Sequence, residues 1–356
     1  MAWTKPKYSR KRVARAGNIL KLNDSSHPEH EWALDVLTNW RSIHGYPINT
    51  FQSTLRDKLY SIDKDALVAQ RLKRAPSVIT KLQRYESMQL HRMNDIAGLR
   101  AVVKSVSKVR ELEKNYRDSR FKHELVNEKD YINNPKETGY RGVHLVYKYK
   151  TPKVPEYENL LLELQIRTRL QHAWATAVET MGTFLNHALK SSEGPDKWLS
   201  FFSLAGSAIA HLENCNPVPG YEHLNKIDTF IQVINDCNTL EVEDRLDAYT
   251  VAADAIHKDH KSGNYHLIIL DTIKKLVTIK SYGRRRLGEA NYEYSKIEKE
   301  ISDGQPYQVV LVAANSIDSL RKAYPNYFLD THEFIKQINR MRRFIDSSAN
   351  RVARGI

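Results

Sequence analysis

The segment Leu162-Glu-Leu-Gln-Ile-Arg-Thr168 combines a strand pattern with the start of a helix. Side chains alternate across a strand, so apolar and polar residues fall on opposite faces: Leu162, Leu164 and Ile166 on one, Glu163, Gln165 and Arg167 on the other. Thr168 and Gln171 have the spacing of a capping box, which predicts that a helix begins here. The segment therefore predicts a strand with one polar face, followed at once by a helix.

Other segments extend this mixed pattern on both sides. Apolar residues from about His30 to Ala69 recur at helical spacing, and Asp330 with Glu333 predicts a capped helix over Asp330–Phe344. Four segments are typical of strands: Leu99–Val103, Tyr140–Tyr147, Tyr265–Tyr282 and Tyr307–Ala313. We therefore expect an α/β (α+β) fold with a mixed central sheet flanked by helices, and a smaller C-terminal α+β domain.

The length of 356 residues exceeds that of most single domains. We expect a basic segment at 1–24, a larger catalytic unit at 25–240 and a regulatory unit at 241–356. No signal-peptide core and no run of about 20 apolar residues occurs, and there are only two cysteines. These features predict a cytoplasmic protein without a membrane partner.

The chain has 55 Lys and Arg against 42 Asp and Glu, a net charge of +13. A positive surplus of this size favours polyanionic partners such as nucleotides and RNA. The charge surplus indicates a class of partner and says nothing about the reaction that the protein catalyses.

Two acidic residues are candidate ligands for Mg²⁺. Asp95 directly precedes a predicted strand, and Glu163 lies on the polar face of another. Mg²⁺ is typically held by one or two carboxylates together with substrate phosphates, so this pair could suffice. Taken singly, Asp95 also fits a turn residue, and Glu163 fits the solvated face of an amphipathic strand.

A basic segment and an aromatic segment complete the candidate site. Arg71 to Lys81 gathers cations around Ser77, a predicted helix N-cap, as a triphosphate-binding segment would. A solvated basic helix is the alternative. Tyr140 and His144 would share one strand face, where a ring could stack on a base and an imidazole could bind a sugar or phosphate. Structural roles for both residues remain open.

In their order and spacing, these segments resemble the synthetase domain of the RelA/SpoT family of alarmone synthetases, over residues 32–212. The resemblance implies roles for the residues that match its motifs. Arg71 and Arg100 would sandwich the adenine of ATP, and Lys73, Ser77, Lys81 and Arg167 would hold its phosphates. Asp95 would bind Mg²⁺, and Glu163 would help to bind it and activate the acceptor 3′-hydroxyl. Tyr140 would stack on the acceptor base, and His144 and Gln165 would line the acceptor side.

The resemblance implies that the β,γ-diphosphate of ATP is transferred to a ribose 3′-hydroxyl. Gly142 and Thr180 stand where the family often has Ser and His, and both departures concern the acceptor. The acceptor is therefore either the 3′-terminal adenosine of tRNA, as in toxic members of the family that stop translation, or GDP or GTP. A catalytically inactive RNA- or ribosome-binding module is a third alternative.

The C-terminal residues resemble the antitoxin-like domain of toxic members that act in phage defence (CapRel-like). In Tyr324-Pro-Asn-Tyr327, Pro325 disfavours a helix at Tyr324, so both rings could be presented from a turn. We expect Tyr324 and Tyr327 to regulate the enzyme by filling the adenine pocket until a trigger, such as a phage structural protein, binds. Packing of the two rings beneath their own helices is the alternative.

Overall fold

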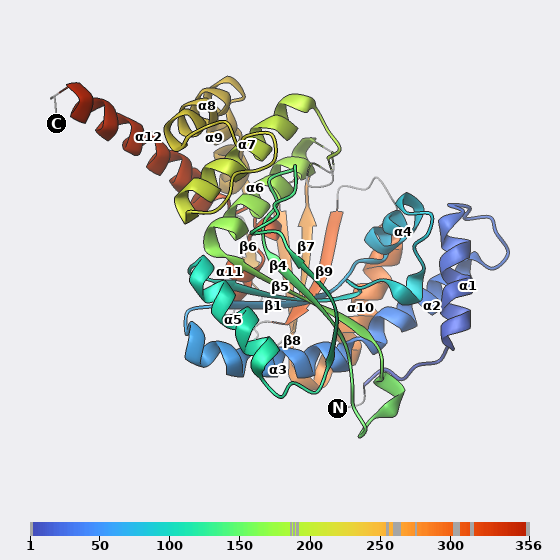
Figure 1. Ribbon diagram of the computed structural model, residues 1–356. Helices are drawn as coiled ribbons and strands as arrows, with labels where there is room; N and C mark the ends of the chain where they lie inside the picture. Colours follow the sequence, from blue (N-terminus) through green and yellow to red (C-terminus); the bar gives the residue numbers. More distant parts are fainter. Residues whose placement is uncertain are drawn as a thin grey trace.

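The computed structural model describes residues 3–185, 187, 189, 192–253, 256–258, 265–274, 276–301, 307–313 and 317–353. Its centre is a nine-stranded sheet with the order β3-β4-β5-β2-β1-β9-β7-β8-β6 (Figure 1). The strands are β1 (Leu67–Leu72), β2 (Ala97–Val103), β3 (Glu124–Asp130), β4 (Val143–Lys148), β5 (Leu161–Thr168), β6 (Ile256–Lys258), β7 (Tyr265–Asp271), β8 (Leu276–Tyr282) and β9 (Tyr307–Ala313).

Helices cover both faces of this sheet. They are α1 (Arg10–Lys21), α2 (His30–Ile43), α3 (Gly45–Ile62), α4 (Ala75–Arg84), α5 (Val106–Asp118), α6 (Arg169–Leu185), α7 (Asp196–Glu213), α8 (Lys226–Thr239), α9 (Val242–Ala253), α10 (Leu287–Glu300), α11 (Ile317–Ala323) and α12 (His332–Ala353). Short 3₁₀ turns occur among others at η1 (Leu90–Arg92) and η5 (Pro325–Tyr327). Helices α3, α5 and α10 pack on one face, and α6, α11 and η5 pack on the other.

The sheet is mixed, as expected from the sequence. Strands β2 and β5 run parallel, as do β6 and β8, whereas the remaining neighbours are antiparallel. The predicted α/β (α+β) class is confirmed.

The alternation read from Leu162 to Thr168 orients strand β5. Leu162, Leu164 and Ile166 are fully buried in the same core cluster as Leu55 of α3 and Leu112 of α5. Burying a side chain of this size stabilises a fold by about 1.5–3 kcal/mol. This packing leaves Glu163 and Gln165 on the opposite face of the sheet, where the candidate site lies.

The C-terminal third of the chain extends the same sheet. Strand β9 pairs with β1 at Val312 and Arg71, and β7, β8 and β6 follow. Helix α12 contacts α6 and α8, and its end projects from the body of the molecule (Figure 1). The division at residue 240 falls between α8 and α9 and stays a prediction.

Three strands, β1, β3 and β6, were not expected from the sequence. Residues Leu67–Leu72 form β1, so the expectation of helix as far as Ala69 was wrong. Pairing with β2 on one side and β9 on the other decides its conformation, and neither pairing is visible in local periodicity. Strand β3 lies at the edge of the sheet and is mostly exposed, so its sequence lacks the apolar alternation of a buried strand.

The predicted helix starts gave mixed results. The capping box is confirmed, because Thr168 N donates to Gln171 Oε1 and Gln171 N donates to Thr168 Oγ1, each over 3.1 Å. The predicted cap at Ser77 was wrong: α4 begins at Ala75, with Pro76 in its first turn, where proline's missing N–H costs no helical hydrogen bond. The helix predicted from Asp330 begins at His332, whose Nδ1 lies 3.0 Å from the Asp330 carboxylate.

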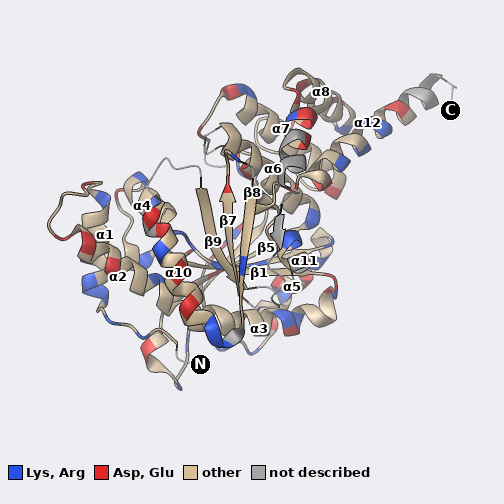
Figure 2. Ribbon diagram, turned by 180° about the vertical axis from the view of Figure 1, so that it is seen from behind, with Lys and Arg blue, Asp and Glu red and all other residues tan. Residues whose placement is uncertain are grey.

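Charged residues lie mainly on the helices, and Figure 2 shows the central strands largely free of them. In the described part of the chain, no helix combines the length and the apolar character needed to cross a membrane.

Candidate active site

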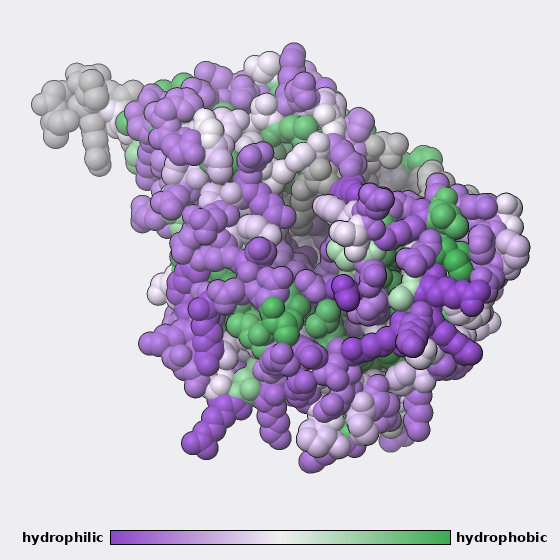
Figure 3. All heavy atoms as spheres, turned by 45° about the vertical axis from the view of Figure 1, so that its right-hand side comes forward, coloured by the Kyte–Doolittle hydropathy of each residue, from purple (hydrophilic) through white to green (hydrophobic). Residues whose placement is uncertain are grey.

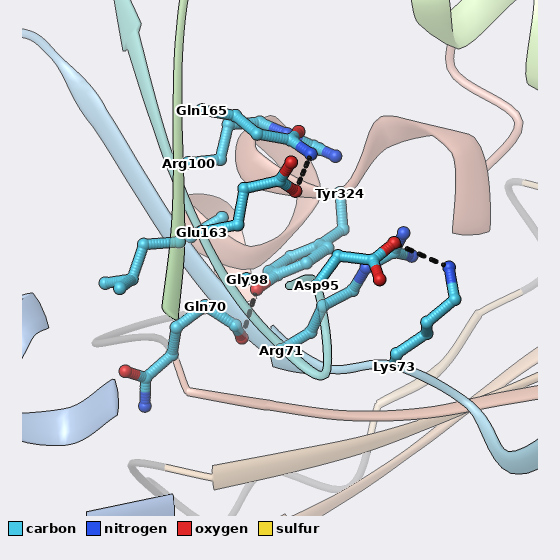
Figure 4. Close-up of a pocket in the computed structure, with 11 residues that line it drawn as sticks. Gln70, Arg71, Lys73, Asp95, Gly98, Arg100, Glu163, Gln165 and Tyr324 are labelled. Carbon is cyan, nitrogen blue, oxygen red and sulfur yellow. Dashed lines mark hydrogen bonds and ion pairs between the residues drawn. The ribbon is translucent and has the colours of Figure 1, made fainter. Parts of the chain in front are cut away.

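A cavity of about 440 Å³ opens on the polar face of β5. It is lined by Ala69, Gln70, Arg71, Lys73, Asp95, Gly98, Leu99, Arg100, Glu163, Gln165 and Tyr324 (Figure 4). The surface in Figure 3 is hollowed near its middle, and hydrophilic side chains border most of that hollow. Three adjacent strands, the turn before β2 and one C-terminal residue thus share a single cavity.

The strand register explains why these residues meet. In one row across the sheet, Gly98 of β2 lies between Glu163 of β5 and Arg71 of β1. In the next row, Arg100 lies beside Gln165. Because Gly98 has no side chain, the space between the carboxylate and the guanidinium stays open.

Asp95 is held by two lysines. Its carboxylate oxygens each accept a hydrogen bond of 3.0 Å, one from Lys73 Nζ and the other from Lys81 Nζ. Burial alone would raise the pKa of Asp95, but the two ammonium groups outweigh it and hold that pKa below its usual value. Asp95 is therefore ionised at neutral pH in a strongly cationic setting.

Glu163 is held by two side chains, His144 and Gln165. His144 Nδ1 donates to its Oε1 over 2.9 Å, and Gln165 Nε2 donates to its Oε2 over 2.7 Å. Burial would raise the pKa of Glu163, and the hydrogen bond from His144 is the main influence that lowers it below its usual value. His144 Nε2 lies 2.6 Å from the Tyr140 hydroxyl, which gives a hydrogen-bonded chain from Tyr140 through His144 to Glu163.

Three arginines lie near this carboxylate pair: Arg167 is buried, and Arg71 and Arg100 are half-buried. Burial, followed by the charge of Arg71, lowers the pKa of Arg100, and burial with Arg100 lowers the pKa of Arg167. One carboxylate, Glu179 on α6, interacts electrostatically with all three. Glu179 was not predicted from the sequence, and its only signal was its place on the helix that follows the polar strand.

Tyr140 is presented by a tight turn. Lys136 N donates to Tyr140 O and Gly139 N donates to Lys136 O, and Gly139 has a φ of +90°. A Cβ on Gly139 would lie 2.9 Å from Phe202 O of α7, so glycine allows the turn to approach that helix. Tyr140 itself is only 5% exposed, between Tyr131, His144 and Trp174.

The structure brings most of the predicted site residues together. Arg71, Lys73, Asp95, Arg100, Glu163, Gln165 and Tyr324 line the cavity, and Lys81, His144 and Tyr140 reach it through the hydrogen bonds described above. Ser77 lies in the first turn of α4. Arg167 does not line the cavity, because its guanidinium is buried and donates to His172 Nδ1.

The donor set suits a divalent ion bound jointly with a substrate. Asp95 and Glu163 offer hard carboxylate oxygens, and no group of three or more acidic, His or Cys side chains in the described residues forms a metal site of its own. Two carboxylates leave room for the phosphate oxygens and waters that Mg²⁺ prefers.

Residues 70–183 match the family described as "Region found in RelA / SpoT proteins". The chain is 36% identical over 125 residues to GTP pyrophosphokinase YjbM of Bacillus subtilis (strain 168), covering 33% of this chain and 58% of that protein. It is 32% identical over 115 residues to GTP pyrophosphokinase YwaC of the same organism, covering 30% and 52%. The chain spans about half the length of these curated relatives.

A solved structure shows the same kind of similarity. It is the small alarmone synthetase 1 from Bacillus subtilis bound to its product pppGpp, with 28% identity and a TM-score of 0.40, covering 48% of this chain and 90% of that one. Every residue predicted to bind metal, ATP or acceptor lies between positions 70 and 183. The family match over residues 70–183 and the two curated relatives therefore support a RelA/SpoT-type region at this site.

Proposed function

We propose that this chain transfers the β,γ-diphosphate of ATP to a ribose 3′-hydroxyl, with Mg²⁺ held by Asp95 and Glu163. The observation that carries this proposal is that both carboxylates line one cavity together with Lys73, Arg71 and Arg100. An acidic pair beside a dense set of cations suits a metal-bound triphosphate.

In the proposed reaction, the acceptor 3′-oxygen bonds to the β-phosphorus of ATP, and the bond from that phosphorus to the α,β-bridging oxygen breaks. AMP leaves, and the hydroxyl proton passes to Glu163. The hydrogen bonds from His144 and Gln165 fix the orientation of Glu163 toward the cavity. Lys73 and Lys81 would turn from Asp95 to the phosphates, where cations offset the charge of the moving group.

Bound Mg²⁺ would supply further charge neutralisation at the triphosphate. Asp95 and Glu163 are the residues that would hold it. Because both are ionised at neutral pH, neither needs to lose a proton before binding a cation.

The test is transfer of label from β- or γ-labelled ATP to an acceptor by full-length protein with Asp95→Asn or Glu163→Gln. Each substitution is combined with Tyr324→Ala and Tyr327→Ala, because these two tyrosines are proposed to close the adenine pocket. Each substitution should lower transfer by a factor on the order of 10²–10³, the usual loss when a transition-state contact is removed. Glu111→Gln, which alters an exposed carboxylate paired with Lys108 on α5, should leave it unchanged. Normal turnover in either site variant would show that the site is misassigned.

We propose the 3′-terminal adenosine of tRNA as the acceptor, so that the product cannot serve in translation. GDP or GTP is the second candidate, favoured by the similarity to two GTP pyrophosphokinases. Labelled ATP incubated with either bulk tRNA or GTP separates the two, because label should enter only one acceptor pool.

We propose further that the C-terminal residues hold the enzyme inactive. Tyr324 lines the cavity beside Arg71 and Arg100, the two residues proposed to sandwich adenine. The hydroxyl of Tyr327 hydrogen-bonds to Arg71, and both tyrosines are 2% exposed. If Arg71 and Arg100 sandwich adenine, the Tyr324 ring, which lies among the side chains that line this cavity (Figure 4), would compete with the adenine for space.

On this reading the protein is a toxin that inhibits itself and acts in phage defence. Withdrawal of Tyr324 would open the ATP pocket, and a ligand can favour that state only by binding it more tightly than the closed one. The proposed trigger is a phage structural protein. Addition of such a protein to the purified chain should start label transfer to tRNA.

A further inference from the structure

A second cavity of about 610 Å³ lies beside the acceptor side of the site, between the turn at 136–140 and helices α6 and α7. Its walls combine apolar surface with hydroxyl groups, and they include Thr138, Val178, Leu199, Phe202, Ser203 and Tyr221. Among the described residues that line it, none is a lysine or arginine, and the single charged residue is Glu137. Apolar walls with a few hydrogen-bonding groups suit a flat, uncharged group such as a nucleobase better than a phosphate.

The turn at 136–140 connects this cavity to the acceptor site. Thr138 lines the cavity, and two residues later Tyr140 bonds to His144 beside Glu163. The turn is fixed on α7, because Ser203 Oγ donates to Glu137 O and a Cβ on Gly206 would lie 2.7 Å from the Cα of Gly139. The two sites therefore keep a constant spacing.

A cation lies at the junction of the two sites. The Lys136 ammonium is 4.7 Å from the centre of the Tyr131 ring and 5.5 Å from that of Tyr140. A nucleotide whose 3′-hydroxyl reached Glu163 would carry its 5′-phosphate away from that carboxylate, and Lys136 is the nearest cation along the turn. The turn itself leads from Lys136 to Thr138, which lines the second cavity.

Thr138 has an unsatisfied polar atom. Its hydroxyl is buried and forms no hydrogen bond within the protein, which is costly for a buried polar group. Because Thr138 itself lines the cavity, a different χ1 rotamer could present this hydroxyl to a bound molecule. The polar edge of a base in the cavity would then give this hydroxyl the partner that it lacks.

We propose that this second cavity binds the base of the nucleotide that precedes the acceptor nucleotide at an RNA 3′ end. Tyr221 offers a ring on which that base can stack, and Thr138 offers the hydrogen bond. The inference rests on the proposed transfer to a ribose 3′-hydroxyl. It gives the site a way to prefer an RNA end to a free mononucleotide, because a mononucleotide leaves the second cavity empty.

The test measures binding of two probes, the dinucleotide CpA and the mononucleotide AMP, to full-length protein without ATP. CpA should bind at least tenfold more tightly than AMP. Thr138→Val keeps the shape of the side chain and removes only the unpaired hydroxyl, so the fold should not lose stability. This variant should weaken CpA binding about three- to tenfold and leave AMP binding unchanged.

Tyr221→Leu should weaken CpA binding by about tenfold through loss of stacking. Thr239→Val is the matched control, because the Thr239 hydroxyl donates to Asn235 O on α8. This variant should change the binding of neither probe. Equal binding of CpA and AMP, or equal effects of Thr138→Val on both, would overturn the inference. Label transfer to GTP in the same preparations would show that the transferase proposal stands even when this inference fails.

Discussion

The Tyr324 hydroxyl donates a hydrogen bond of 2.6 Å to the backbone carbonyl of Gln70, although 254 positions separate the two residues. Gln70 belongs to β1, and its neighbour Arg71 bonds to the hydroxyl of Tyr327. Two tyrosines of the C-terminal residues are therefore bound to the strand that lines the candidate ATP pocket. In the proposed inhibition, these two hydrogen bonds hold the tyrosines at the pocket.

Replacing both tyrosines should release the enzyme. In full-length protein, Tyr324→Ala with Tyr327→Ala removes the ring from the pocket, so label transfer should rise at least tenfold and expression should slow cell growth. Both side chains are buried, so the variant should also lose about 3–5 kcal/mol for each ring removed. Circular dichroism should establish that the variant is folded before its activity is compared.

Two further substitutions sharpen this comparison. Tyr324→Phe keeps the ring in place and removes one hydrogen bond, so it should remain largely inhibited. Tyr292→Ala alters a tyrosine of α10 that is 74% exposed, and it should change neither activity nor growth. A folded double variant that is as inactive and harmless as the wild type would refute the proposed inhibition.

A buried ion pair should be a second attachment of the C-terminal residues. Arg41 of α2 bonds to Glu298 of α10 over 2.6 Å, with 4% and 7% of the side chains exposed. Glu298 also accepts from Ala75 N at the start of α4, and Arg41 Nε donates to Lys73 O. Glu298→Gln should lower the free energy of unfolding by about 3–5 kcal/mol, because it leaves a buried guanidinium without its counter-ion.

Chemical denaturation measures this loss, and the double variant tests its cause. Arg41→Met with Glu298→Leu should recover most of the stability, since no uncompensated charge stays buried. Glu289→Gln on the same helix alters an exposed pair with Arg286 and should have little effect. Equal losses in the single and double variants would mean that the ion pair itself is not responsible.

The sequence predicted which residues share one face of a strand or cap one helix. It did not predict the contacts between segments that are distant in the chain. The polar face of β5 and the capping box at Thr168 follow from local spacing, and both are found in the structure. Strand β1 owes its conformation to β2 and β9, and the burial of Arg41 depends on Glu298. Glu179 could not be predicted for the same reason, because Arg71 and Arg100, with which it interacts, lie on other elements.

The close approach of the turn to α7 can be tested at Gly139. An added Cβ would lie 2.9 Å from Phe202 O and 2.9 Å from the Trp174 ring, and φ is +90°. Gly139→Ala should therefore destabilise the fold by about 1–3 kcal/mol and shift Tyr140. The KM for the acceptor should rise severalfold, whereas the KM for ATP should change little because β1 and α4 are untouched.

Gly220→Ala is the matched control for the backbone strain. Gly220 has the same φ of +90°, and a Cβ there would meet nothing within 4 Å. Gly220→Ala should therefore lose less stability than Gly139→Ala, and its KM for the acceptor should equal that of the wild type. If both glycine variants affect acceptor KM alike, the contact with α7 does not position Tyr140.

The pairing of Asp95 with Lys73 and Lys81 should make stability sensitive to acid. Burial opposes ionisation of Asp95, but the two lysines lower its pKa in the folded protein below the value in the unfolded chain, about 3.9. The unfolded state then binds the proton more readily, so ionised Asp95 contributes stability above the unfolded pKa. That contribution is lost as the pH falls through the folded pKa.

Asp95→Asn removes the titrating group and leaves the two lysines without their shared carboxylate. At pH 7 the variant should be less stable than the wild type in urea denaturation, and the difference should narrow as the pH falls below about 4. Added Mg²⁺ should widen the difference at pH 7, since the proposed ion binds only the folded wild-type site. A difference that stays the same from pH 7 to pH 3 would mean that the charge of Asp95 contributes nothing to folding.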